Sequence, residues 1–166
     1  MKQLIVVRHA KSSWNEPALN DFDRPLNKRG KHEAPFMAKK LKDKIEQIDL
    51  IITSPALRAI TTANIFAAEF EYEVENIIKQ NLLYEADYSD IVKALHEIDD
   101  KIERVMLFGH NPGLTVFINY ITGRQIDNLP TCGIAGIEFD FESWKELNPS
   151  TGKLFLFEYP KMYLTE

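Results

Sequence analysis

Short apolar runs recur along the chain at residues 4–7, 50–53 and 105–108. Apolar and polar side chains do not alternate within these runs, which is typical of strands that are buried on both faces of a parallel sheet. Segments with helical periodicity lie between the runs. This alternation of strands and helices predicts an α/β fold, with one domain over residues 1–166.

The segments that separate or follow these runs carry helix start signals. Asn27 is an acceptable N-cap, and Pro35 inside the helix that follows should kink it, because an interior proline removes a backbone hydrogen bond. Ser54 and Asn111 each precede a proline, which suits an N-cap followed by proline at the first helical position. The expected helices run from 27 to 44, from 54 to about 70, from 89 to 98, and onward from 111–112.

The last part of the chain predicts a β-hairpin. Residues 134–141 and 154–159 have strand character, and the turn-forming sequence Asn148-Pro149-Ser150-Thr151-Gly152 lies between them. Two strands joined by such a turn pair in antiparallel fashion. We expect this hairpin at an edge of the sheet.

Each of the first three apolar runs is followed at once by polar side chains. The first run leads into Arg8 and His9, the second into a Ser-Pro pair and then Arg58, and the third into His110. Because the carboxyl ends of parallel strands share one edge of a sheet, two imidazoles and two guanidiniums are expected to meet there. Guanidinium forks and helix N-termini bind tetrahedral oxyanions, and an unprotonated imidazole can attack phosphorus. The pattern indicates a phosphate pocket with a nucleophilic histidine.

Composition narrows the functional classes. The 166 residues carry 20 Lys and Arg against 25 Asp and Glu, and this net charge of −5 argues against general binding to nucleic acid or to an acidic membrane. The single cysteine, Cys132, rules out an intramolecular disulfide and a cysteine-based metal site. No apolar stretch approaches the roughly 20 residues of a membrane helix, and the N-terminal run is too short for a signal peptide. The expected compartment is therefore the cytoplasm.

Three sequence blocks together resemble one known family. Arg8-His9-Ala10, with Ser12 and Asn15 after it, resembles the Arg-His-Gly signature that opens the histidine phosphatase superfamily. The segments 53–59 and 109–111 are similar to the second and third blocks of that family. Asp23-Arg24-Pro25-Leu26 resembles its SixA-type phosphohistidine phosphatase branch, as does the lack of a large insertion between the second and third blocks. The resemblance spans residues 2–141 and implies a three-layer α/β/α sandwich with a mostly parallel sheet, similar to phosphoglycerate mutase.

The resemblance also implies roles for individual side chains. His9 would be the phosphorylated nucleophile, Arg8 and Arg58 would clamp the phosphoryl group, and His110 would complete the pocket. No metal and no organic cofactor are implied. Additional substrate-binding positions are expected at Ser12, Asn15 and Arg24.

Three residues in or near these blocks need separate interpretation. Arg24 is expected either at the rim of the pocket or in a surface pair with Asp21 or Asp23. Lys11 stands where many relatives carry Glu, so it adds positive charge near the pocket mouth and favours anionic substrates. Ala10 replaces the usual glycine of the signature, which we do not interpret as a loss of activity.

The identity of the substrate depends on the general acid. Glu85 lies about where relatives that act on alcohol esters carry a catalytic acid, and it is either that acid or an ordinary loop carboxylate. An alkoxide leaving group needs such a donor, whereas imidazole, with a pKa near ~6.5, leaves phosphohistidine with a proton it already carries. We therefore expect a phosphatase acting on phosphohistidine in a protein.

Three alternatives stay open. The first is a small-molecule phosphomonoesterase that uses Glu85 as its acid. The second is a phosphate-binding regulatory module without turnover. The third is a metal site built from His9, His110 and carboxylates, for which the sequence shows no ligand spacing. A phosphorylated protein or a small phosphorylated molecule is thus the expected partner, and the sequence does not indicate the oligomeric state.

Overall fold

Within residues 1–16 and 18–164, which the computed structural model describes, six strands form one sheet in the order β3-β2-β4-β1-β5-β6. The pairs β2–β3, β2–β4 and β1–β4 are parallel, while β5 is antiparallel to both β1 and β6. The predicted mostly parallel sheet is confirmed. The strands are β1 (Lys2–Arg8), β2 (Leu50–Thr53), β3 (Ile78–Lys79), β4 (Arg104–Gly109), β5 (Ile134–Phe139) and β6 (Gly152–Glu158).

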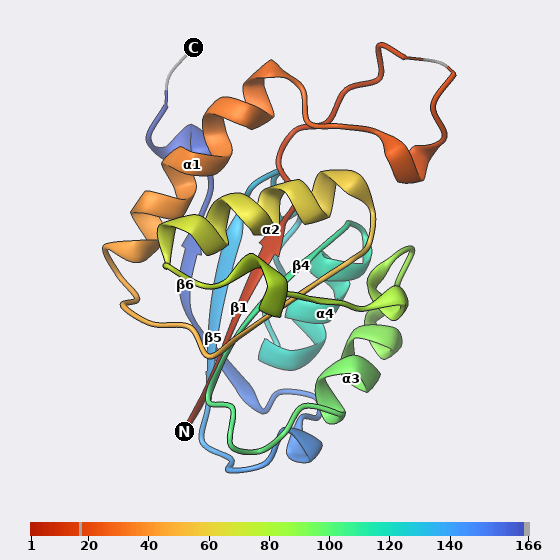
Figure 1. The fold of residues 1–166 in the computed structure, drawn as a ribbon. Coiled ribbons are helices and arrows are strands. Elements are labelled where there is room, and N and C mark those ends of the chain that lie inside the picture. Colours follow the sequence, from red (N-terminus) through yellow and green to blue (C-terminus); the bar gives the residue numbers. More distant parts are fainter. Residues whose placement is uncertain (17, 165–166) are drawn as a thin grey trace.

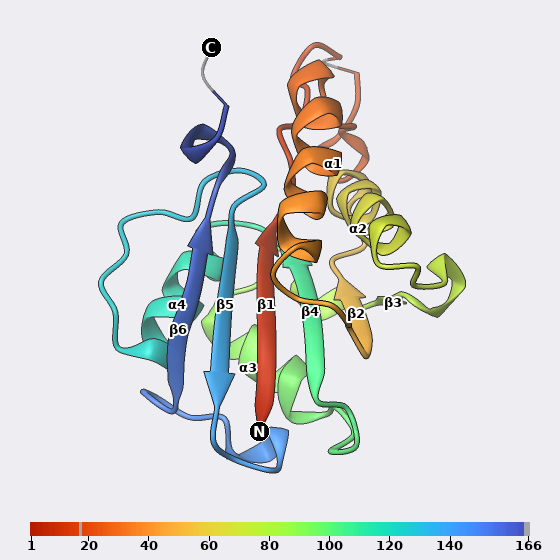
Figure 2. The same cartoon turned by 90° about the vertical axis from the view of Figure 1, so that its left-hand side faces the viewer.

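Helices cover both faces of this sheet (Figures 1 and 2). One pair packs on one face and the other pair on the opposite face, which confirms the three-layer α/β/α sandwich. No helix in the described part of the chain is long and apolar enough to cross a membrane. The first pair is α1 (Lys28–Lys42) with α2 (Leu57–Glu69), and the second is α3 (Tyr88–His96) with α4 (Gly113–Thr122).

Strand β1 shows why the apolar runs do not alternate. Leu4 and Val6 belong to the core under α3 and α4, whereas Ile5 belongs to the core under α1 and α2 together with Val7. All four side chains are fully buried. Burying each of them stabilises the fold by roughly 1.5–3 kcal/mol, so this strand is firmly held in the middle of the sheet.

Two predicted helix starts are corrected by the structure. Helix α2 begins at Leu57 and not at Ser54-Pro55, and its N-cap, Ala56, receives no side-chain hydrogen bond. Ser54 does not cap the helix because its hydroxyl is engaged in a short turn and by a histidine of the site. Helix α4 begins one residue later than expected, at Gly113.

The other expected elements are found close to their predicted positions. Asn27 caps α1 through its side chain, and the helix continues through Pro35. The hairpin of β5 and β6 lies at the sheet edge, and β6 runs in the same direction as β1 because β5 is antiparallel to both. Strand β3 was not predicted, since a two-residue strand is too short to show a period.

Candidate active site

His9 follows the last residue of β1 and is held on both sides by backbone hydrogen bonds. Its N–H donates to the carbonyl of Gly109, and its carbonyl accepts from the N–H of Cys132. The imidazole is only 8% exposed, and its Nδ1 lies 2.7 Å from the carbonyl oxygen of Ala10. Because a carbonyl oxygen can only accept, Nδ1 carries the proton. The lone pair of the neutral ring is therefore on Nε2.

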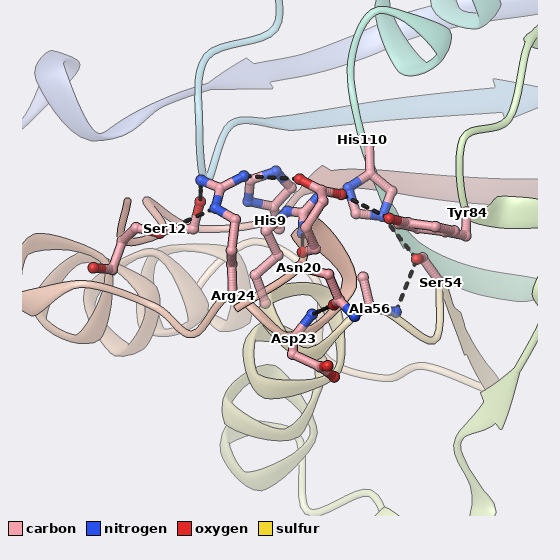
Figure 3. Close-up of polar contacts among 12 residues, drawn as sticks. His9, Ser12, Asn20, Asp23, Arg24, Ser54, Ala56, Tyr84 and His110 are labelled. Carbon is pink, nitrogen blue, oxygen red and sulfur yellow. Dashed lines mark hydrogen bonds and ion pairs between the residues drawn. The ribbon is translucent and has the colours of Figure 1, made fainter. Parts of the chain in front are cut away.

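His110 follows β4 and lies beside His9, with 5.2 Å between the two ring centroids. Its Nε2 is 2.7 Å from the hydroxyl oxygen of Ser54, which also accepts the N–H of Ala56 at 3.2 Å (Figure 3). The ring of Tyr84 packs edge-on against the imidazole, 5.7 Å away. The buried Nδ1 of His110 has no hydrogen-bond partner among the described residues, so this nitrogen is left to meet a ligand.

Both imidazoles are uncharged near neutral pH. Burial is the main cause that lowers the pKa of His9 to about 3; electrostatic interactions with His110, Arg58 and Arg8 act in the same direction, and the hydrogen bond to the Ala10 carbonyl opposes them. Burial also lowers the pKa of His110 to about 4, with Arg58 and Arg8 adding to the shift and Asp21 opposing it. Both arginines thus act electrostatically on the two imidazoles, which lie beside each other.

Each of the two arginines has one buried donor without a hydrogen-bond partner among the described residues. Arg58, in the first turn of α2, donates from Nη1 to the carbonyl of Asp21 at 2.6 Å and from Nη2 to its carboxylate at 2.9 Å. Arg8 donates from Nη1 to the carbonyl of Leu129 at 3.0 Å. The Nε atom of each guanidinium is buried without a partner among the described residues. A bound oxyanion could satisfy both of these donors.

Asp21 connects the pocket to the long loop between β1 and α1. Its carboxylate accepts from Arg58, from Arg24 at 3.0 Å and from the hydroxyl of Tyr84 at 2.7 Å. Partial burial opposes ionisation, but these hydrogen bonds outweigh it and hold the pKa of the Asp21 carboxyl well below its usual range. Burial and the bond to Asp21 raise the pKa of Tyr84 to about 12.

Arg24 pairs with Asp21, as one alternative predicted, and in this pair the arginine is buried while the aspartate is exposed at the surface. Arg24 is 7% exposed, and it donates to the carbonyl of Ser13 at 3.0 Å and to the hydroxyl of Ser12 at 2.5 Å (Figure 3). Its Cζ lies 3.2 Å from the ring centroid of Trp14. Ser12, expected to bind substrate, therefore holds Arg24 in place.

Two predicted residues lie outside this network of contacts. Asn15 is exposed on the loop, where its N–H donates to the hydroxyl of Ser13, and among the described residues its side chain makes no hydrogen bond to the pocket. Glu85 lines a hollow of about 460 Å³ that it shares with His110. In residues 1–16 and 18–164, no group of three His, Cys, Asp or Glu side chains is placed to hold a metal ion.

Sequence reasoning did not place Asp21, Tyr84 or Ser54 in the site. The only signal for Asp21 was its position three residues before Arg24, and none marked Tyr84. Ser54 was interpreted as a helix cap, whereas its hydroxyl contacts His110. These contacts join segments that are far apart in the chain, so local patterns could not indicate them.

The fold and the site define an α/β protein that brings two imidazoles and two guanidiniums together at one edge of its sheet. A sequence profile of the histidine phosphatase superfamily (branch 1) matches residues 4–105. The chain belongs to the histidine phosphatase superfamily. An uncharacterised chloroplastic protein of Arabidopsis thaliana is 30% identical over 157 residues, which cover 87% of this chain and 70% of the relative.

Solved structures agree with this family assignment. The crystal structure of a protein assigned as the phosphohistidine phosphatase SixA from Agrobacterium tumefaciens superposes with a TM-score of 0.79 at 25% identity, covering 96% of this chain and 98% of that one. A protein histidine phosphatase SixA complexed with tungstate gives a TM-score of 0.80 at 22% identity, over 93% of this chain and 95% of that one. The fold is thus that of SixA-type proteins.

Proposed function

We propose that this protein is a phosphatase that forms a covalent phosphohistidine on His9 and that its substrate is phosphohistidine in another protein. The observation that carries this proposal is the state of the His9 ring. A carbonyl oxygen holds the Nδ1 proton, and the low pKa keeps the ring neutral, so a lone pair is available on Nε2. Neutral imidazole is a competent nucleophile toward phosphorus.

The reaction proceeds in two displacements. Nε2 of His9 attacks phosphorus and forms a P–N bond, while the bond from phosphorus to the leaving nitrogen breaks and its electron pair departs with the imidazole. A water molecule then attacks phosphorus and forms a P–O bond, while the P–Nε2 bond breaks and its electron pair returns to His9. The water loses a proton to solvent, and phosphate is released. The unpartnered Nε donors of Arg8 and Arg58 support this proposal, since they can stabilise charge on the phosphoryl oxygens in both steps. His110 contributes in the same way when its Nδ1 carries the proton and its Nε2 accepts from the Ser54 hydroxyl.

The surroundings of the hollow beside His110 support a substrate on a protein. Tyr88 and Val116 line this hollow and are 38% and 47% exposed, respectively. An exposed apolar rim suits contact with a polypeptide that presents its phosphorylated side chain. Imidazole as the leaving group also needs no strong acid in the pocket.

A rapid-quench experiment tests the covalent step. The protein is mixed with a labelled phosphoryl donor, quenched, and mapped for acid-labile phosphate. We expect the label on His9 and its loss in His9→Ala, with circular dichroism showing an intact fold. Label that persists in the folded variant would overturn the proposal, and so would hydrolysis by the native protein without any label.

One observation favours a second function, hydrolysis of phosphate esters with Glu85 as acid. Glu85 shares the hollow with His110, and its backbone adopts a φ of 55°, which is uncommon for a residue other than glycine. The Glu85→Gln variant separates the two functions, with an alkyl phosphate and a phosphoramidate as substrates. A selective loss of activity on the alkyl phosphate supports the esterase. Equal activity of variant and native protein on both substrates supports the phosphohistidine phosphatase.

A further inference from the structure

A second hollow, of about 370 Å³, is lined in part by Arg8 and has a basic lining. Its lining includes Arg8, Lys11, Arg29 and Lys161, and no acidic side chain of the described residues lines it. The whole chain, by contrast, has a net charge of −5. Four cations around one hollow are therefore a local feature that the overall composition hides.

The topology explains why these cations meet. Strand β6 runs in the same direction as β1, so the residues after β6, including Lys161, reach the same sheet edge as Arg8 and Lys11. The first turn of α1 closes the hollow. A Cβ placed on Gly30 would lie 2.2 Å from the carbonyl oxygen of Lys11, which shows how tightly that turn is packed against the chain after β1. Arg29 is held next to Lys11 by this close packing.

The charge in the hollow is only partly balanced by the protein. Arg29 pairs with Glu33 at 2.9 Å. Lys11 and Lys161 are exposed, and neither forms an ion pair within residues 1–16 and 18–164. Among the described residues, four cations line the hollow and one carboxylate pairs with them, and this excess of positive charge favours an anion in the hollow.

Neutral donors add to this basic lining. Asn128 and Thr131 lie in the wall of the hollow. Asn111 donates from Nδ2 to the Oδ1 of Asn128 at 2.9 Å, which fixes which end of the Asn128 amide is the acceptor. Its Nδ2 is then a donor, and the Thr131 hydroxyl is another, so the hollow can offer hydrogen bonds as well as charge to an oxyanion.

We infer that this hollow binds a second anionic group of the substrate, a carboxylate or a phosphate that lies next to the phosphoryl group being transferred. The inference rests on the proposed function, because Arg8 belongs to both sites. It lines the hollow, and its positive charge lowers the pKa of His9 and of His110 in the phosphate pocket. A substrate that spans both sites carries its second anion about one side chain away from the phosphoryl group. The preferred substrate class is thus a phosphorylated group with an acidic neighbour.

Equilibrium binding tests this inference without relying on turnover. Two peptides carry the same non-hydrolysable phosphonate mimic of phosphohistidine and differ only in flanking Glu or Gln residues. A second arm compares pyrophosphate with orthophosphate. Dissociation constants are measured for the native protein, for Lys11→Gln and Lys161→Gln, and for Lys145→Gln, an exposed lysine in the connection between β5 and β6 that serves as the matched control.

The native protein should bind the Glu peptide more tightly than the Gln peptide, and pyrophosphate more tightly than orthophosphate. Each of the two lysine substitutions in the hollow should reduce that preference roughly fivefold, because an ion pair about 4 Å long near water is worth about this much. The control Lys145→Gln should leave the preference unchanged, and added salt should weaken it. If the lysine variants lose the preference for the Glu peptide, the substrate is a protein. If they lose only the preference for pyrophosphate, the substrate is a small polyanion.

The inference is overturned when neither pair shows a preference or when Lys145→Gln changes it as much as the hollow variants do. A failure of the proposed function would look different. In that case the phosphonate preference would persist, but no label would form on His9 and no substrate would be hydrolysed.

Discussion

The carboxylate of Asp21 lies 2.9 Å from Nη2 of Arg58, and the carbonyl oxygen of the same aspartate lies 2.6 Å from Nη1. One residue of the loop between β1 and α1 thereby fixes the plane of a guanidinium on α2. Because both terminal nitrogens of Arg58 are engaged, its buried Nε is the donor left without a partner among the described residues. The loop therefore determines how the Arg58 guanidinium is oriented in the pocket.

Replacing Asp21 by Asn should reduce kcat/KM roughly three- to tenfold. The variant keeps the shape of the side chain but loses the charge that aligns Arg58 and Arg24, and the effect is modest because the carboxylate is 47% exposed. Steady-state kinetics measure the change. Asp23→Asn, at an exposed neighbouring position, is the control and should behave like the native protein. Tighter substrate binding by Asp21→Asn would show instead that the carboxylate competes with phosphate.

Acidification should destabilise the fold through the two buried histidines. The pKa of His9 is about 3 and that of His110 about 4 in the folded protein, whereas an unfolded histidine has a pKa of ~6.5. The unfolded chain therefore binds more protons below pH ~6.5, and the free energy of unfolding falls as the pH drops from there toward the folded pKa values. His9 alone should account for about 2 kcal/mol between pH 7 and pH 5.

Urea unfolding at these two pH values measures that loss. A His9→Asn variant should lose less stability on acidification than the native protein, because it lacks the group that gains a proton on unfolding. An identical pH dependence of the two proteins would show that His9 is already protonated in the folded state. Proton NMR of the ring hydrogens gives an independent measurement of both histidine pKa values.

Replacing Ser54 by Ala should lower kcat more than it affects stability. The hydroxyl holds Nε2 of His110 at 2.7 Å and also accepts the N–H of Ala56. Its removal frees the ring of His110 to rotate, and a loss of one such hydrogen bond corresponds to roughly five- to tenfold in rate. Single-turnover kinetics with saturating substrate measure the step. A variant with native kcat would show that the edge-on contact of Tyr84 is enough to orient the imidazole.

Replacing Gly30 by Ala should destabilise the fold by about 1–3 kcal/mol. The new Cβ would lie 2.2 Å from the backbone carbonyl of Lys11, which cannot move aside as a flexible side chain would. Chemical denaturation of this variant and of Lys31→Ala, an exposed neighbour on the same helix, measures the difference. Equal stability of the two variants would show that the first turn of α1 can shift away from the loop.

The sequence predicted those parts of the site that follow from local patterns and from one topological rule. Buried apolar runs identified β1, β2 and β4, and the shared edge of parallel strands brought Arg8, His9 and His110 together. The rest depended on contacts between distant segments. Tyr84 meets Asp21 across 63 positions of the chain, so no periodicity could indicate the pair.

The predicted start of α2 at Ser54-Pro55 was wrong for a related reason. A Ser-Pro pair after a strand has two uses, either as a helix cap or as a short turn whose hydroxyl faces another element. Which of them occurs depends on whether a partner such as His110 lies nearby, and this is fixed only once β2 and β4 are paired. Strand β3 escaped prediction because pairing with β2 and not its own sequence creates it.

The stacking of Trp14 on Arg24 gives this protein an optical probe of its own. The chain has two tryptophans, and the other one, Trp144, is fully buried in the core on the α3 and α4 side of the sheet. Trp14 is 73% exposed and lies 3.2 Å from the guanidinium carbon of an arginine in the pocket network. A change in the stacking of Trp14 on Arg24 would therefore alter its fluorescence, while the buried Trp144 serves as an internal reference.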